Sequence, residues 1–412
     1  MNYNFEEVLN SMSLALDLAE MSTFNDNQIF DCETNIHYTT ESFLDHSKKT
    51  TYISLELCKE LDLNKYLVED IYLASLIHDI GAIEALEKSH ATNEFILGHC
   101  ITGSNLLQNK LFNNISDLIR SHHENWDGSG PLNLKGNSIP IGSQIIRLAD
   151  ILAIKFATNS QKLLNRDEII SWVESKNNAV FSNTITQAFI NIASTDSFWL
   201  NLSNIAKIPS LIKTISPRIA RTLTLDEIEI IAYIFAQIVD KKSPFTAKHS
   251  REIGDLSYRV SKYIGFNENK CKKMKLAGLF HDIGKLAISS EILNKNGALS
   301  SSEFNTVKSH SYYTNLILSP ITGFDDVRMW ASNHHEKLNG TGYPNKLTAK
   351  NLSLESRILA VCDIYQALTE DRPYRDGLSQ ENAFDILKEM GRDNLICMKA
   401  VKLLYEALKT NG

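Results

Sequence analysis

The stretch LFHDIGK at Leu279–Lys285 repeats, with two letters changed, the stretch LIHDIGA at Leu76–Ala82. The two histidine–aspartate pairs are 203 residues apart. A second repeated stretch follows each of them, SHHENWDGSGPL at Ser121–Leu132 and NHHEKLNGTGYP at Asn333–Pro344. Each of these has two adjacent histidines, a glutamate and a glycine-rich turn. Self-similarity at one offset indicates that a domain has been duplicated.

The same residue types recur along both copies. Ten of the twelve histidines of the chain fall at matched positions, five in each copy. The other matched ligand-type residues, first copy before second, are His46 and His249, His99 and His310, and Asp150 and Asp363. The offset widens from 203 to 211 residues because the second copy has a longer connection, LAISSEILNKNGALSSSEF, after its histidine–aspartate pair. We predict the first copy in residues 1–195, a helical connector in residues 196–240 and the second copy in residues 241–412.

Apolar residues recur mostly at helical spacing. In the second copy His249, Ile253, Leu256 and Val260 follow one another at steps of four, three and four, as on one face of an α-helix. Alternating patterns typical of strands are nearly absent. We therefore predict an all-α fold of two tandem helical domains joined by a helical connector.

Composition excludes several classes of protein. The 412 residues carry a net charge of −7, with 43% hydrophobic residues, so a partner of the nucleic-acid polymer class is not expected. The most apolar long stretch, Ile228–Val239, is too short to span a membrane, and the first residues do not form a secretory signal. The six cysteines form no C-x-x-C pair. A cytoplasmic location is the simplest expectation.

The second copy carries a set of residues typical of metal sites. The candidate ligands are His249, His281, Asp282, His310, His334, His335 and Asp363. Imidazole binds iron, manganese, zinc or nickel, and a carboxylate is able to bridge two ions. Seven ligands are too many for one ion and about right for two.

The second copy resembles a known family. HDIGK at His281–Lys285, together with HHEKLNGTGYP at His334–Pro344, is similar to the HD-GYP phosphodiesterases, a branch of the HD superfamily of metal-dependent phosphohydrolases. The segments ILNKNGALSSSEF and RILAVCDIYQALTEDRPYR also resemble that family. The resemblance covers nearly all of the second copy. It implies HD-type helical domains and an enzyme that hydrolyses a cyclic dinucleotide.

The resemblance also implies roles for the candidate ligands. One divalent transition metal ion, iron, manganese or similar, would be held by His249, His281, Asp282 and Asp363. The other would be held by Asp282, His310, His334 and His335. Asp282 would bridge the two ions, and a hydroxide between them would attack phosphorus.

Residues around the metal site acquire substrate roles from the same resemblance. Lys285 is expected to contact a phosphate oxygen, and Arg372 and Arg375 to hold the phosphodiester or a guanine edge. Tyr343 is expected near the metal pocket, beneath a nucleobase or against the adjacent helix. In its turn, Gly342 is expected to supply an unusual φ and Pro344 to fix the exit.

Three positions depart from the family pattern. Asn339 replaces the usual aspartate of the glycine-rich turn, and Gln366 replaces an aspartate three residues after the last ligand. Some members hold a third metal through a glutamate four residues before the first histidine. Phe245 occupies that position here, which favours two metals. Because neither Asn339 nor Gln366 is a ligand in the scheme above, we expect these two replacements to tune the activity and not to abolish it.

The first copy keeps a matching residue for every proposed ligand. These residues form a vestigial metal site: His46, His78, Asp79, His99, His122, His123 and Asp150. Ala82 replaces Lys285, the tyrosine of the G-Y-P turn is missing, and no R-P-Y-R run follows Asp150. Three interpretations stay open: a structural or regulatory domain, a second weak active site, or a domain without metal.

The predicted function is a phosphodiesterase that opens 3′,3′-cGAMP, cyclic di-GMP or both to a linear dinucleotide. The tandem layout resembles the cGAMP-active members somewhat more. An HD phosphohydrolase of mononucleotides is a weaker alternative, because that class does not need the G-Y-P loop. A non-catalytic signalling adaptor is another, although it would be expected to have lost ligands in both copies. The sequence also leaves open a homodimer or a signalling partner that binds through the first copy.

Overall fold

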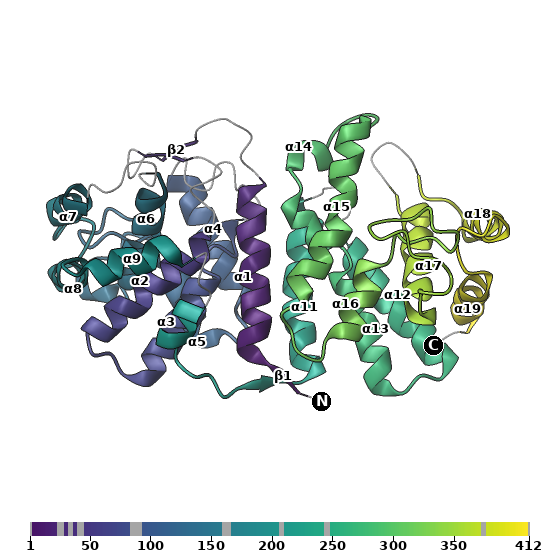
Figure 1. Ribbon diagram of the computed structural model, residues 1–412, viewed down its shortest axis with the longest axis horizontal. Coiled ribbons are helices and arrows are strands. Elements are labelled where there is room, and N and C mark those ends of the chain that lie inside the picture. Colours follow the sequence, from purple (N-terminus) through teal and green to yellow (C-terminus); the bar gives the residue numbers. More distant parts are fainter. Residues whose placement is uncertain are drawn as a thin grey trace. The chain divides into compact units, whose positions relative to one another are not determined.

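The computed structural model describes residues 2–22, 29–31, 36–38, 45–82, 93–158, 166–205, 210–242, 248–371 and 376–410. Across these ranges there are nineteen α-helices, and the strands form two sheets of two strands each. The prediction of an all-α fold is confirmed (Figure 1). The chain divides into two compact units, an N-terminal unit of Met12–Ala220 and a C-terminal unit of Met1–Ser11 with Arg221–Gly412. No helix in the described ranges is long and apolar enough to cross a bilayer.

The N-terminal unit contains the first set of repeated motifs. Its elements are the end of α1 (Phe5–Met21), β2 (Ile29–Asp31), β3 (Ile36–Tyr38), α2 (His46–Glu60), α3 (Lys65–Leu76), α4 (Asn93–Leu106), α5 (Asn113–Arg120), the 3₁₀ helix η3 (Gly136–Ser138), α6 (Ile141–Thr158), α7 (Arg166–Ser175), α8 (Asn183–Ala193), α9 (Asp196–Asn204) and α10 (Ser210–Ile215). Helix α2 lies at the centre, packed against α3, α6 and α8, while α4 packs on α5.

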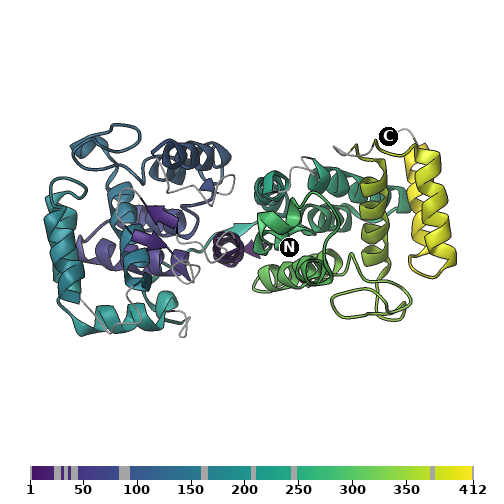
Figure 2. The ribbon, with the colours of Figure 1, turned by 90° about the horizontal axis from the view of Figure 1, so that it is seen from above.

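The C-terminal unit contains the second set. Its elements are β1 (Tyr3–Asn4), the start of α1, β4 (Thr222–Leu223), α11 (Leu225–Lys242), α12 (His249–Ile264), α13 (Glu268–Phe280), η4 (Ile283–Ala287), α14 (Ser290–Leu293), α15 (Ser301–Leu318), α16 (Asp325–Ser332), α17 (Leu354–Thr369), α18 (Gln380–Arg392) and α19 (Met398–Lys409). Strands β1 and β4 pair antiparallel. Helix α12 packs on α13 and α17, and α18 and α19 lie beside α17 (Figures 1 and 2).

Corresponding helices of the two units begin in the same way. Helices α2 and α12 start at His46 and His249, and the predicted apolar face of α12 is buried. Helices α3 and α13 are capped by Asn64 and Asn267, whose side chains accept hydrogen bonds from Leu67 N and Lys270 N. Such caps satisfy one of the free N–H groups at a helix start. The residues predicted as a connector, 196–240, contain α9, α10, β4 and most of α11, and α11 packs on α12 and α13.

The glycine of each HDIG stretch lets two backbones come unusually close. A Cβ atom placed on Gly284 would lie 2.0 Å from His310 O, and one placed on Gly81 would lie 2.0 Å from His99 O. In the C-terminal unit Gly284 N donates to Thr314 Oγ1 at 3.1 Å, and that hydroxyl donates to His281 O at 2.9 Å. The helix that carries the third histidine is therefore held directly against the histidine–aspartate pair.

The substitution Gly81→Ala tests this close approach. The added methyl group overlaps backbone atoms, so we expect the free energy of unfolding to fall by about 1–3 kcal/mol, as for overpacked cores. Gly98→Ala is the control, because Gly98 is an exposed residue of α4 with no atom within 4 Å of the added Cβ. Removing a helical glycine there should stabilise the protein by about 0.5–1 kcal/mol. Urea denaturation measures the free energy of unfolding of both variants. Equal changes in the two variants would contradict the close backbone approach at Gly81.

Candidate metal centre and active site

All seven candidate ligands of the C-terminal unit lie together. They come from different helices: His249 begins α12, His281 and Asp282 follow α13, His310 lies in α15, His334 and His335 follow α16, and Asp363 lies in α17. Six of these residues are buried, while the His335 side chain keeps 30% of its surface exposed. The packing of α12, α13, α15, α16 and α17 thus brings residues more than a hundred positions apart to one point.

The Asp282 carboxylate lies between two groups of imidazoles. Its Oδ2 atom is 3.1 Å from His281 Nε2. Its Oδ1 atom is 3.6 Å from His310 Nε2 and 3.9 Å from His334 Nε2. The Asp363 carboxylate extends both groups, with Oδ1 at 3.3 Å from His249 Nε2 and Oδ2 at 3.9 Å from His335 Nδ1. Each oxygen of Asp282 therefore faces its own group of imidazoles.

Backbone carbonyls orient three of these imidazoles. His281 Nδ1 lies 2.7 Å from Gly278 O, and His310 Nδ1 lies 2.6 Å from Val307 O. His334 Nδ1 is held in the same way by Ala331 O at 2.6 Å. A carbonyl oxygen only accepts, so each Nδ1 donates its hydrogen to the backbone. Each Nε2 is thereby directed at the carboxylates, and in a neutral ring it is the nitrogen that is able to bind a metal. This arrangement is typical of histidines that bind metals.

Two buried polar atoms of the cluster lack hydrogen-bond partners within the described ranges, and a metal ion would satisfy them. Among the residues that the structure describes, Asp282 Oδ1 and His281 Nε2 have no hydrogen-bond partner, although both atoms are buried. Buried polar atoms without partners are costly. Ligand atoms 3 to 4 Å apart have the spacing expected around an ion with bonds of about 2.0–2.2 Å. The groups His249, His281 and Asp363, and His310, His334 and His335, are able to hold metal ions.

The charges at the cluster differ between its two sides. Burial opposes ionisation of Asp282, but the positive charges of His281 and Lys285 hold its pKa well below the usual range. Burial lowers the pKa of His310 to about 3, and it lowers that of His334 well below its usual value. Burial also disfavours protonated His249, but the neighbouring carboxylates of Asp363 and Glu370 outweigh it and raise that pKa to about 9. The His310 side is therefore neutral and ready to bind a cation, while a cation on the His249 side must displace a proton.

The glycine-rich turn is held to the cluster by Glu336. Its two carboxylate oxygens accept hydrogen bonds from Asn345 N at 2.7 Å and Leu347 N at 2.8 Å. Glu124 does the same in the N-terminal unit, with Leu132 N at 2.6 Å and Leu134 N at 2.7 Å. The repeated glutamate after each histidine pair is thus a clamp on the following loop.

The prediction that Gly342 supplies an unusual φ is wrong. Gly340 has the positive φ of the turn, 78°. Gly342 is needed for space, because a Cβ there would lie 2.4 Å from Lys337 N and 2.5 Å from Glu336 Cα. Asn339 retains the turn-forming function expected of the aspartate it replaces: its Oδ1 atom accepts from Thr341 N at 3.1 Å. Side chains of this type commonly stabilise such turns.

The structure places two of the four predicted substrate-binding residues. Lys285 donates from Nζ to Asp282 Oδ2 at 2.6 Å, with 20% of its side chain exposed. The ring of Tyr343 packs on His335, with ring centroids 4.9 Å apart. Arg372 and Arg375 lie outside the described residues, as does Phe245. Gln366 donates to Glu252 and does not contact the ligands in the described contacts.

Three supporting carboxylates, two in the C-terminal unit and one in the N-terminal unit, were not found by the sequence analysis. Glu370 Oε2 lies 3.5 Å from His249 Nδ1, on the side of the ring away from the cluster. Asp240 accepts hydrogen bonds from Ser250 N and Ser250 Oγ, next to His249. Asp17 accepts from Ser47 N in the N-terminal unit. No spacing rule links these residues to the motifs, and only comparison of the two copies could have suggested Asp17 and Asp240.

The N-terminal unit reproduces most of this geometry. His46 Nε2 is 3.2 Å from Asp150 Oδ1, and His78 Nε2 is 3.0 Å from Asp79 Oδ2. On the other side, Asp79 Oδ1 lies 3.7 Å from His99 Nε2 and 3.8 Å from His122 Nε2. Both Asp79 oxygens are buried without a hydrogen-bond partner among the described residues. This vestigial site therefore also offers oxygen and nitrogen atoms to a metal ion.

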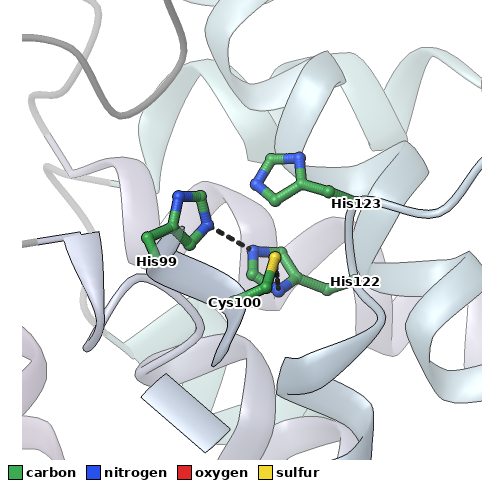
Figure 3. A group of neighbouring side chains, drawn as sticks. All are labelled: His99, Cys100, His122 and His123. Atoms are coloured by element: carbon green, nitrogen blue, oxygen red, sulfur yellow. Dashed lines mark hydrogen bonds between the residues drawn. The ribbon is translucent and has the colours of Figure 1, made fainter. Parts of the chain in front are cut away.

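Cys100 lies beside these histidines but behind one of them. Figure 3 shows His99 and His122 facing each other through ring nitrogens, with Cys100 against His122. Cys100 Sγ is 3.9 Å from His122 Nδ1, the nitrogen that donates to Ile119 O at 2.6 Å. Asp79 faces the other ring nitrogen, Nε2. The thiol therefore belongs to the wall behind His122 and not to the face that a metal would occupy.

Comparison with known proteins identifies the family. The HD domain profile matches residues 32–163 and 233–396, which together are more than half of the chain. The chain belongs to the HD domain family. The two matched ranges contain the two histidine–aspartate pairs, so the chain carries the HD domain twice.

Several proteins similar to this chain are named phosphodiesterases. A 3'3'-cGAMP-specific phosphodiesterase of Vibrio cholerae is 30% identical over 394 residues, 90% of this chain and 87% of that relative. A cyclic di-GMP phosphodiesterase of Pseudomonas aeruginosa is 36% identical over 154 residues, 36% of each chain. The crystal structure of a cyclic GMP-AMP specific phosphodiesterase of Vibrio cholerae is 22% identical and covers 98% of both chains with a TM-score of 0.65. That structure shows the same tandem fold.

Glu336→Gln tests the clamp on the glycine-rich turn. The amide is neutral and retains one acceptor oxygen, so both N–H groups lose a charged acceptor and either Asn345 N or Leu347 N faces an NH2 donor instead of an oxygen. We expect the free energy of unfolding to fall by about 1–3 kcal/mol. Glu389→Gln, on an exposed position of α18, should change it by less than about 0.5 kcal/mol. Denaturant titration of both variants measures the difference, and a Glu336 variant as stable as the control would refute the clamp.

Proposed function

We propose that the chain is a metal-dependent phosphodiesterase that hydrolyses a cyclic dinucleotide to a linear one, with 3′,3′-cGAMP as the preferred substrate. The observation that carries the proposal is the Asp282 carboxylate, whose two oxygens face separate groups of imidazoles. Such a carboxylate suits a pair of divalent ions. The cGAMP preference is supported by the relative that matches 90% of this chain. This chain resembles the cyclic di-GMP relative over a much shorter segment.

The proposed ligands form two sets in the C-terminal unit. His249, His281, Asp282 and Asp363 would hold one ion, and Asp282, His310, His334 and His335 the other. Iron or manganese in the divalent state suits these nitrogen and oxygen donors. When bound, the two ions supply Lewis-acid chemistry, activating water and neutralising charge on the phosphate oxygens.

The remaining residues position the substrate. Lys285 places a positive charge at the exposed rim, next to Asp282, where it is able to turn from that carboxylate to a phosphate oxygen. Tyr343 fixes His335 through the packing of their rings. Glu336 keeps the turn that carries Tyr343 in place. Roles for Arg372 and Arg375 in substrate binding stay predictions, as does a regulatory role of the N-terminal unit through a homodimer or a partner protein.

A competition assay tests the proposed function. Protein prepared anaerobically with Fe(II) or Mn(II) receives equal 3′,3′-cGAMP and cyclic di-GMP, and linear products are separated by chromatography. We expect 3′,3′-cGAMP to disappear first. The variant His281→Ala, Asp282→Ala should lose about 10³-fold or more of the activity, because one proposed ion loses two ligands and the other loses the shared Asp282. The matched variant His78→Ala, Asp79→Ala should keep most of it.

The outcomes of this assay separate the alternatives. Preference for cyclic di-GMP would overturn the substrate assignment and leave the reaction class intact. Consumption of neither substrate by metal-loaded protein would overturn the phosphodiesterase proposal and favour an adaptor or a mononucleotide phosphohydrolase. Activity lost only in the His78 and Asp79 variant would move the chemistry to the N-terminal unit.

Lys285→Ala tests the proposed phosphate contact. The substitution introduces the residue found at the matching position of the N-terminal unit, Ala82. Loss of one charge-assisted hydrogen bond, about 1.5–3 kcal/mol, should lower kcat/KM by about 10- to 100-fold. The number of bound metal ions should not change, because Lys285 is not among the proposed ligands. Kinetics and metal analysis of the same sample measure both. A lowered metal content would show instead that Lys285 acts through Asp282.

A further inference from the structure

A buried arginine distinguishes the vestigial site from its counterpart. Arg147 lies in α6, one helical turn before Asp150, and only 3% of it is exposed. The matching position in α17, one turn before Asp363, is Ala360. A guanidinium is therefore built into the N-terminal unit at a point where the C-terminal unit has a methyl group.

The guanidinium contacts a histidine that the sequence predicts as a ligand. Arg147 Nη1 is 2.9 Å from His123 Nδ1, and Arg147 Nη2 donates to Asn125 Oδ1 at 3.2 Å. In the C-terminal unit the matching nitrogen, His335 Nδ1, faces the Asp363 carboxylate instead. The two units thus differ in what the second histidine of the pair faces.

This contact determines the chemistry of His123. A guanidinium remains protonated in proteins and has no lone pair, so Arg147 donates and His123 Nδ1 accepts. An imidazole nitrogen has one lone pair, and a lone pair that accepts this hydrogen bond is not available to a metal. The neutral ring then carries its own hydrogen on Nε2, which also cannot coordinate. His123 as the structure holds it is not a metal ligand.

The loss of His123 affects only one side of the vestigial site. His46, His78, Asp79 and Asp150 remain as four ligands on one side. On the other side His99, His122 and Asp79 remain. The His123 ring is 4.2 Å from the His122 ring and 4.7 Å from the His99 ring, so its guanidinium partner lies close to that second position. A fixed positive charge there repels a divalent cation, and burial strengthens the repulsion.

We propose that Arg147 replaces one of the two metal ions in the N-terminal unit, so that the vestigial site holds a single divalent ion. Burial supports a closed site: His123 is 1% exposed, whereas the His335 side chain is 30% exposed. The Asp150 side chain is 3% exposed and that of Asp363 is 11% exposed. The proposal rests on the metal chemistry proposed for the C-terminal unit. It concerns metal content and not hydrolysis, so a chain inactive on dinucleotides would leave it standing.

The test counts metal ions in the full-length chain. The C-terminal site is first disabled with His281→Ala and Asp282→Ala, and the protein is loaded anaerobically with Mn(II), desalted and analysed by mass spectrometry. We expect one ion per chain, with the six-line electron paramagnetic resonance signal of isolated Mn(II). Adding Arg147→Ala, which copies Ala360, should raise the count to two and produce the signal of a coupled pair.

Further variants keep the test decisive if Arg147→Ala does not fold. His123→Ala should leave the count at one, whereas His46→Ala should reduce it to none. As a matched control, His335→Ala in a chain whose vestigial site is disabled by His78→Ala and Asp79→Ala should reduce the count of the C-terminal unit from two to one. Two ions or none with Arg147 intact, a count that stays at one in folded Arg147→Ala, or a loss of metal in His123→Ala would each overturn the proposal.

Discussion

In each unit one buried aspartate, Asp79 or Asp282, presents its two carboxylate oxygens to two different groups of histidines. The packing of the surrounding helices holds those histidines in place. In the C-terminal unit Oδ2 of Asp282 faces His281 and Oδ1 faces His310 and His334. Bringing His310 this near requires α15 to lie on the HDIG backbone, which only a glycine at Gly284 permits. Burying charged groups in this way is favourable only with compensating cations. The cluster is therefore suited to bind metal ions, and such binding would stabilise the fold.

The fold class and the set of candidate ligands were predictable because both depend on patterns that repeat along the chain. The division of those ligands into two sets came from the family resemblance alone. Helical spacing identified α12, and the shared offset identified matched histidines without any alignment. The places where two backbone segments approach each other closely were not predictable from the sequence. Gly342 was assigned a conformational role that belongs to Gly340, since a glycine needed for a positive φ and one needed for space look alike in a sequence. Glu370 and Asp240 were missed because no motif marks a residue that contacts the ligand His249 or its neighbour Ser250 from outside the cluster.

The two units keep the same central ligands and differ in the residues around them. The carboxylate and the imidazoles on either side of it keep nearly the same distances. Two differences lie at residues with predicted substrate roles, Lys285 against Ala82 and Tyr343 against a missing residue. The third, Ala360 against Arg147, is buried beside the ligands. If each unit binds metal as proposed, that binding would contribute to folding in both units, whereas phosphate binding would be needed only in the unit that catalyses hydrolysis. A buried guanidinium in place of an ion retains positive charge beside the remaining ligands without requiring a second metal.

The most direct test of the central claim is a crystal structure of the Mn(II)-loaded protein, with anomalous diffraction recorded at the manganese edge. The account predicts two anomalous peaks in the C-terminal unit, one on each side of Asp282, with Oδ1 bound to one ion and Oδ2 to the other. A single peak there, or two peaks with Asp282 bound to only one of them, would contradict it.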